Sequence, residues 1–190
     1  DKIITISEHS RQTYENTKYK LQHPETGEIV DIGCMAPIDY VSYPTRTFDP
    51  EPLDLDLTTD FNFLSVVQIS PRKNLPQLLK AFVDVHGDNE DVGLILKVNT
   101  AKNSKIDRLN TLGRLRETLN QHRDRKCKIY LLHGYLTDAQ MAALYSHPKV
   151  KAFVSTTHGE GFGLPMFEAA GYGLPVIAPD WSGHVDFLYM

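Results

Sequence analysis

The sequence predicts an α/β fold with a doubly wound parallel sheet of the Rossmann type. From residue 61 onward, short apolar runs suited to buried strands alternate with segments whose apolar residues recur at helical spacing. Strands and helices that alternate in this way form a parallel sheet covered on both faces. The composition of the 190 residues, 41% hydrophobic and 23% charged, is ordinary for a soluble globular protein. The length suits one domain, or one domain with an appended piece of another.

The first 60 residues are the least regular part of the chain. Residues 3–7 predict a short buried strand, and residues 7–14 predict a helix start with Ser7 as cap and Glu8 near the positive helix end. Residues 24–59 are rich in Pro, Asp and Thr, and residues 43–60 predict a linker. Its acids suit a solvated connector better than a metal site, because no histidine or fixed loop geometry accompanies them: Asp49, Glu51, Asp54, Asp56 and Asp60.

Three strands and two helices are predicted next. Residues 61–69, 92–98 and 127–132 are apolar runs typical of buried strands. Residues 74–85 predict a helix capped by Asn74, with one apolar face made by Leu75, Leu78, Leu79 and Phe82. Residues 104–119 predict a second helix with a stripe made by Ile106, Leu109, Leu112 and Leu115.

The remaining elements follow the same alternation. Residues 137–145 predict a helix that Thr137 and Gln140 open as a capping box and that Pro148 stops. Residues 150–155 and 174–178 predict a fourth and a fifth strand. Residues 164–173 predict a short helix between them, with Pro165 in its first turn.

One candidate site lies in the turn after the first of these five strands. Ligands of doubly wound sheets bind outside the carboxyl ends of the strands. Arg72 and Lys73 leave that strand just before a helix N-terminus, where free amides and two cations suit a phosphate. The alternative is that both are exposed loop charges.

A second candidate site lies in the turn after the fourth strand, residues 157–164. Its glycines let backbone amides approach a ligand, and Glu160 stays in the loop while Glu168 lies about one helical turn into the next helix. A carboxylate there suits the vicinal hydroxyls of a ribose. The alternative is a plain glycine-rich turn with one glutamate at a helix start. The dinucleotide fingerprint is absent, because its third glycine would fall at Met166.

These segments resemble a known family. The run "EGFGLPMFE" is similar to the Glu-x7-Glu signature of the retaining GT-B glycosyltransferases called group 1, or glycosyltransferase family four. Residues 63–82, 131–145 and 169–188 resemble the family's phosphate-binding segment, base-pocket segment and continuation, in the same order. Residues 1–14 resemble the end of its N-terminal domain. The resemblance implies an N-terminal remnant and linker over residues 1–60 and a truncated C-terminal donor-binding domain over residues 61–190.

The resemblance implies roles for individual residues. Glu160 would lie near the transferred sugar, and Arg72 and Lys73 would neutralise the diphosphate leaving group. Glu168 would bind the ribose hydroxyls of a nucleotide-diphosphate sugar. The remaining donor contacts would come from Gly161, Phe162, Gly163, Leu164, Tyr135 and Leu136. No metal and no cofactor is expected, since the nucleotide-diphosphate sugar is itself the donor substrate.

The sequence departs from the family pattern at several positions. Gln68 stands about where an arginine is common, so Arg72 is a candidate substitute. Lys97 ends a strand that lacks the usual Gly-x-Gly, and either points toward the ligand or is exposed. His158 either touches the sugar or packs the loop. Residues 180–187, with His184 and Asp186, are interpreted as a loop near the phosphates without a metal.

The resulting hypothesis is a fragment of a hexosyl- or mannosyl-type retaining glycosyltransferase, inactive alone. The chain begins without a methionine inside a predicted strand, and it stops at Met190 with the run "VDFLYM", which favours a fragment. Its acceptor would be a glycan or a lipid-linked sugar bound by the missing domain. The alternatives are a GT-B-like sugar-nucleotide epimerase or phosphorylase, and a non-catalytic nucleotide-binding or interaction domain.

Charge and cysteine content narrow the partners and the compartment. The net charge of −4 argues against nucleic acid. Two distant cysteines, Cys34 and Cys127, predict buried thiols in a reducing compartment. No signal peptide and no apolar run of about 20 residues appears, so we expect a cytoplasmic protein, with peripheral association at the inner membrane face left open.

Overall fold

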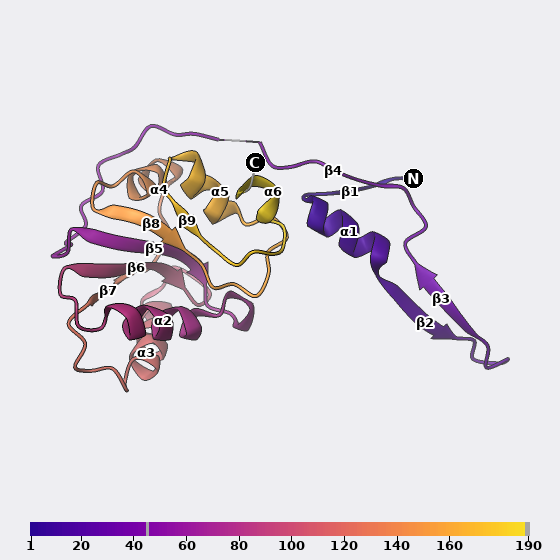
Figure 1. Ribbon diagram of the computed structural model, residues 1–190, viewed down its shortest axis with the longest axis horizontal. Coiled ribbons are helices and arrows are strands. Elements are labelled where there is room, and N and C mark those ends of the chain that lie inside the picture. Colours follow the sequence, from indigo (N-terminus) through magenta and orange to yellow (C-terminus); the bar gives the residue numbers. More distant parts are fainter. Residues whose placement is uncertain (45, 189–190) are drawn as a thin grey trace. The chain divides into compact units, whose positions relative to one another are not determined.

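The computed structural model describes residues 1–44 and 46–188, and Figure 1 shows the chain as a ribbon. The described chain divides into two units. The sheet unit contains residues 46–159 and 164–179, and the terminal unit contains residues 1–44, 160–163 and 180–188. The predicted domain boundary between residues 60 and 61 stays a prediction.

A five-stranded parallel sheet organises the sheet unit, and it confirms the predicted fold class. Its strands are β5 (Phe61–Gln68), β6 (Val92–Asn99), β7 (Lys128–Leu132), β8 (Val150–Val154) and β9 (Val176–Ile177). They lie in the order β7-β6-β5-β8-β9, and every neighbouring pair is parallel. The chain therefore winds from β5 outward in one direction and later returns to continue from β8 in the other, as a doubly wound sheet requires.

Helices cover both faces of this sheet. They are α2 (Leu75–His86), α3 (Lys105–Thr118), α4 (Asp138–Tyr145) and α5 (Leu164–Gly171). In Figure 1, α2 and α3 lie together on one side of the strands, and α4 and α5 lie on the other. Alternate residues of β6 are buried toward each side: Leu94 and Leu96 belong to the core beneath α2 and α3, while Ile95 between them is also only 1% exposed. Burial on both faces explains the apolar run that predicts this strand.

The helix α2 matches its predicted apolar face but not its predicted cap. Leu75, Leu78, Leu79 and Phe82 are all buried. Asn74 does precede the helix, but its φ is 52° and its side chain makes no capping hydrogen bond. The reason is that Asn74 also ends a short 3-10 helix, η1 (Pro71–Lys73), in the left-handed conformation that asparagine tolerates.

The predicted apolar stripe of α3 is wrong at Ile106 and Leu109, whereas Leu115 is buried and Leu112 is partly buried. Ile106 and Leu109 are 73% and 64% exposed, and the buried residues of this helix are Asp107, Thr111 and Leu115. A spacing of three residues drifts around a helix of 3.6 residues per turn, so one face cannot hold all four apolar residues. Hydrogen bonds of Asp107 to the preceding loop fix the rotation instead.

The terminal unit contains small elements, several of which the sequence did not predict. The strand β1 (Ile3–Thr5) pairs with β4 (Ile38–Tyr40), and α1 (Glu8–Asn16) is capped by Ser7, whose Oγ accepts a hydrogen bond from the Ser10 amide, as predicted. An antiparallel hairpin of β2 (Lys18–Gln22) and β3 (Ile29–Gly33) was not predicted. Both of its strands are short and largely exposed, so they lack the buried apolar run that marks the other strands. The unit ends with α6 (Val185–Leu188), in a segment that the sequence predicts as a loop.

Neither a metal cluster nor a membrane helix is found in the described residues. The five linker acids are exposed, and the part of the chain that the structure describes holds no group of three or more His, Cys, Asp or Glu suited to a metal ion. Within residues 1–44 and 46–188, no helix is both long and apolar enough to cross a bilayer. Cys127 is buried as predicted, whereas Cys34 is only partly buried.

Candidate functional site

The candidate site of the sheet unit lies at the point where the strand order reverses. The strands β5 and β8 are neighbours, and the chain leaves β5 toward β6 but leaves β8 toward β9. The loops that follow β5 and β8 therefore diverge at the carboxyl edge, and this is where open α/β sheets bind ligands. They are the two turns that the sequence singles out.

The loops after β5 and β8 are joined by hydrogen bonds of Arg72. Its Nη1 donates to the carbonyl oxygen of Gly159 at 2.5 Å. Its own carbonyl oxygen accepts from the His158 amide at 2.8 Å and from Thr157 Oγ1 at 3.3 Å. Arg72 itself is exposed and Lys73 is half-buried, so both cations lie at the carboxyl edge of β5. Two cations on a turn that is fixed to its neighbour suit a diphosphate.

Glu168 lies on α5, about one turn from the start of the helix, as predicted. One of its carboxylate oxygens accepts a hydrogen bond from the Tyr145 hydroxyl at 2.9 Å. Burial, together with the charge of Asp138, raises the pKa of Glu168, and the hydrogen bond from Tyr145 opposes that rise. Tyr145 is 2% exposed and stacks on Tyr172, with ring centroids 5.9 Å apart. The sequence did not single out Tyr145, which looks like an ordinary apolar residue at the end of α4.

Gln68 and Lys97 both bind backbone carbonyls of neighbouring loops. Gln68 Nε2 donates to the carbonyl oxygen of Thr100 at 3.2 Å, and Lys97 Nζ donates to that of Gly134. Lys97 is half-buried, and burial lowers its pKa. The interpretation of Lys97 as an exposed lysine at the strand end is therefore wrong, and its direction toward a ligand stays a prediction. Whether Arg72 takes the usual arginine role stays a prediction.

A buried polar network supports the segment predicted to flank the base. His133 Nε2 lies 2.9 Å from Asp107 Oδ2, and the two side chains are 3% and 7% exposed. The Asp107 carboxylate also accepts hydrogen bonds from the amides of residues 100–102. The network thus connects the loop after β6 with the end of β7, immediately before Tyr135, which is 69% exposed, and Leu136, which is partly buried. No local pattern in the sequence indicates this pair, because its members are 26 residues apart.

The loop that carries Glu160 belongs to the terminal unit. The Glu160 amide donates to Ser182 Oγ at 2.6 Å, and its carbonyl oxygen accepts from Ser182 Oγ at 2.5 Å and from the Gly183 amide at 3.0 Å. Phe162 is 3% exposed and packs against Tyr43 and Phe187, with ring centroids 5.1 and 5.0 Å away. The loop is therefore held by hydrogen bonds between its backbone and residues 182–183, and by one buried ring.

Two glycines of this loop have defined surroundings. Gly161 offers its carbonyl oxygen to Ser7 Oγ at 2.6 Å. Gly163, which precedes Leu164 at the start of α5, has a φ of 97°, which favours glycine over any other residue. The glycine-rich character of the segment thus has a structural cause in addition to any role in binding.

A family model described as "Glycosyl transferases group 1" matches residues 51–188. The chain belongs to this family. The match covers both candidate turns and confirms the resemblance derived from the motifs.

Curated relatives also match part of the chain. The serotype-specific mannosyltransferase WbdA of Escherichia coli is 33% identical over 119 residues, which are 63% of this chain and 13% of that protein. The probable sucrose-phosphate synthase 5 of Oryza sativa subsp. japonica is 28% identical over 141 residues, which are 66% of this chain and 13% of that protein. The chain therefore spans about one eighth of these relatives, 13% of their length.

Solved structures agree on the fold. OtsA has a TM-score of 0.64 at 13% identity, with 100% of this chain and 48% of that chain covered. A TarM variant of S. aureus, solved in complex with UDP among other ligands, has a TM-score of 0.57 at 16% identity, with 93% of this chain and 29% of that chain covered. At these identities the likeness establishes the fold alone.

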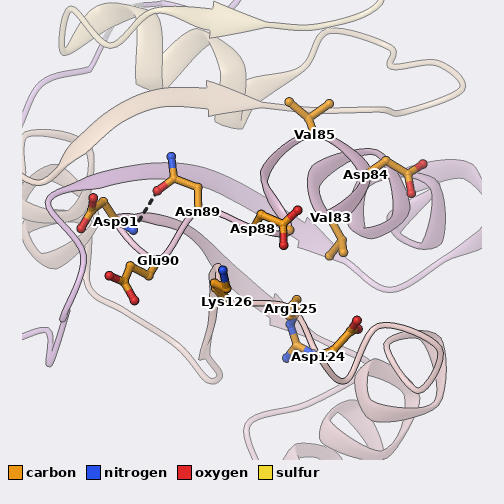
Figure 2. A pocket seen from close by; sticks show the side chains of 11 residues that line it. Val83, Asp84, Val85, Asp88, Asn89, Glu90, Asp91, Asp124, Arg125 and Lys126 are labelled. Carbon is orange, nitrogen blue, oxygen red and sulfur yellow. Dashed lines mark hydrogen bonds between the residues drawn. The ribbon is translucent and has the colours of Figure 1, made fainter.

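The pocket in Figure 2 lies at the opposite edge of the sheet from the candidate turns. Its residues precede β6 and β7, so they lie at the amino ends of these strands: residues 83–85, 87–91 and 124–126. Acidic side chains such as Asp88, Glu90 and Asp124 line it beside Arg125 and Lys126. Open α/β sheets ordinarily bind ligands at the carboxyl edge, so this pocket is separate from the candidate site that the two turns predict.

Proposed function

We propose that the chain is the donor-binding part of a retaining glycosyltransferase that moves a sugar from a nucleotide-diphosphate sugar to an acceptor. The observation that carries the proposal is the Arg72 side chain, which joins the loops after β5 and β8 at the switch point. A diphosphate placed there meets Arg72, Lys73 and the start of α2. Family membership supports sugar transfer as the reaction.

The proposed chemistry is electrostatic. The bond between the sugar and the diphosphate breaks, and negative charge develops on the departing oxygen. Arg72 and Lys73 stabilise that charge as it forms, which is where fixed cations and amides are most effective. Glu168, held by Tyr145, accepts hydrogen bonds from the ribose hydroxyls. Glu160 lies near the transferred sugar, and the backbone of Gly161, Phe162, Gly163 and Leu164 contacts the donor.

The finer assignments also belong to this proposal. Tyr135 and Leu136 flank the base, and neither a metal nor a cofactor takes part, since the two cations do that work. The name of the relative WbdA supports a hexosyl or mannosyl donor. A preceding domain binds a glycan or lipid-linked acceptor, so the isolated chain binds nucleotide without transferring sugar. The protein works in the cytoplasm or at the inner membrane face.

The test compares the isolated chain with the full-length protein. Calorimetry with UDP, GDP and ADP on the chain is expected to find one preferred nucleotide. The full-length protein, given hexoses linked to that nucleotide and an acceptor panel, is expected to form a glycoside with the donor's anomeric configuration. A free epimerised sugar nucleotide would support an epimerase instead, and release of sugar 1-phosphate would support a phosphorylase. Absence of nucleotide binding at millimolar concentration would support a non-catalytic domain.

A further inference from the structure

The Ser182 hydroxyl makes hydrogen bonds to both polar backbone groups of Glu160, the candidate catalytic residue. The hydroxyl accepts from the Glu160 amide at 2.6 Å and donates to the Glu160 carbonyl oxygen at 2.5 Å. Both polar backbone groups of Glu160 thus bond to one side chain that is 22 residues away in the sequence. Because these two groups flank the Cα atom, holding them fixes the direction in which the Glu160 side chain leaves the backbone.

The backbone of Ser182 adopts a conformation that is rare for a serine. Its φ is 90°, and the residue is 4% exposed. Only one other described residue that is not glycine, Asn74, has a positive φ. A non-glycine residue persists in this region only where its surroundings determine it, and such residues cluster at functional sites. Glycine would fit this backbone with less strain, so the hydroxyl is the feature that distinguishes serine here.

The loop that carries Glu160 packs closely against the segment around Gly183. A Cβ on Gly183 would lie 2.0 Å from the Gly161 carbonyl oxygen, so the two segments touch backbone to backbone. Ser7 donates to that same Gly161 oxygen at 2.6 Å and is 0% exposed. Two buried serine hydroxyls therefore hold two consecutive residues of the loop. Of these two serines, Ser182 is the one that bonds to Glu160, whose carbonyl oxygen also accepts from the Gly183 amide.

We infer that Ser182 is a positioning residue that orients Glu160 for the sugar-transfer step. The inference rests on the proposed function, because it assigns Ser182 to the reaction of that same site. Ser182 acts through Glu160, so its loss is expected to slow turnover much more than it weakens donor binding, to which Arg72, Lys73 and Glu168 contribute in the proposed function.

The test measures kcat and donor KM in the full-length protein for Ser182→Ala and Ser182→Gly. We expect kcat to fall at least tenfold in both variants and donor KM to stay within twofold. Ser182→Gly guards against misfolding, because glycine accepts the φ of 90°. Ser65→Ala is the matched control: Ser65 is a 0% exposed serine on β5 whose hydroxyl has no hydrogen-bond partner among the described residues. Its kcat is expected to match that of the wild type.

A double-mutant comparison separates positioning from a general structural role. If Ser182 acts through Glu160, then adding Ser182→Ala to Glu160→Gln lowers kcat no further than Glu160→Gln alone. Independent, multiplying losses would overturn the inference, as would kcat within twofold of wild type in both single variants. A wild-type protein that transfers no sugar from any donor would instead contradict the proposed function, and with it any role for Ser182 in transfer.

Discussion

Replacing Glu168 by glutamine tests the proposed ribose contact directly. The substitution keeps the size of the side chain and removes its negative charge. One carboxylate oxygen accepts from Tyr145 at 2.9 Å, and the residue is otherwise exposed on α5, so a ligand can reach it. We therefore expect nucleotide affinity to fall while the fold stays intact.

The size of this loss follows from the kind of hydrogen bond removed. A hydrogen bond to a charged group contributes about 1.5–3 kcal/mol, and about 1.4 kcal/mol is a factor of ten in affinity. Glu168→Gln is thus expected to weaken nucleotide binding about 10- to 150-fold. Tyr145→Phe keeps the charge of Glu168 and removes only one donor that orients it, so it is expected to weaken nucleotide binding less than Glu168→Gln does.

The pH dependence of binding adds an independent signature. Although the residue is exposed overall, partial desolvation of its carboxylate by the surrounding residues, together with the nearby Asp138, raises the pKa of Glu168 above its ordinary value of 4.5. Because the ribose hydroxyls bind the ionised form, wild-type affinity is expected to fall as the pH is lowered through that raised pKa. Glu168→Gln has no such group to titrate, so its affinity is expected to change less over the same pH range.

The assay is calorimetry of the chain with its preferred nucleotide at neutral and at mildly acidic pH. Glu117→Gln, which changes an exposed glutamate on α3, is the matched control and is expected to bind as the wild type does. A dissociation constant for Glu168→Gln within twofold of the wild-type value at neutral pH would refute the assignment of Glu168 to the ribose.

Two further predictions concern stability of the sheet unit. Gly93→Ala places a Cβ 2.1 Å from Asn62 Oδ1, and we expect it to lower the free energy of unfolding by urea by about 1–3 kcal/mol. Gly113→Ala in α3 places its Cβ where nothing lies within 4 Å, and it is expected to raise the free energy of unfolding by about 0.5–1 kcal/mol. Equal effects of the two substitutions would contradict this reasoning. Burial raises the pKa of Asp107, but hydrogen bonds from His133 and three amides lower it more, to below its ordinary value of 3.8. Its stabilisation is present above that pH and lost as the pH falls further, so the difference in Tm between wild type and Asp107→Asn is expected to shrink in acid, and a constant difference would argue against it.

The sheet was predictable because its signals are local. Each strand of the sheet unit is an apolar run, and each cap or turn that the prediction used lies within a few residues of its helix, as Thr137 and Gln140 do. The order of the strands then places Arg72 and Lys73 at the switch point, since connections in such sheets follow few topologies. Fold and location of the candidate site therefore follow from patterns that one segment carries by itself.

The features that were missed depend on partners far away in the sequence. The rotation of α3 is set by Asp107, whose partner His133 is 26 residues distant, and the environment of Glu168 by Tyr145, 23 residues before it. A leucine stripe cannot reveal a buried carboxylate, because an aspartate in a helix is ordinarily exposed. The hairpin of β2 and β3 was missed for a different reason, since its strands are exposed and lack the apolar run that predicts a buried strand.

The two glutamates of the Glu-x7-Glu motif are supported by different parts of the chain. Glu168 stands on a helix of the sheet unit and is oriented by Tyr145, whereas the loop of Glu160 is held by Ser7 and Ser182 from the two ends of the chain. The two glutamates are thus separated by only seven residues, but different residues hold them in place. Because separate supports can be altered one at a time, nucleotide affinity and turnover are expected to respond to different substitutions, and the division of labour between the two acids becomes measurable.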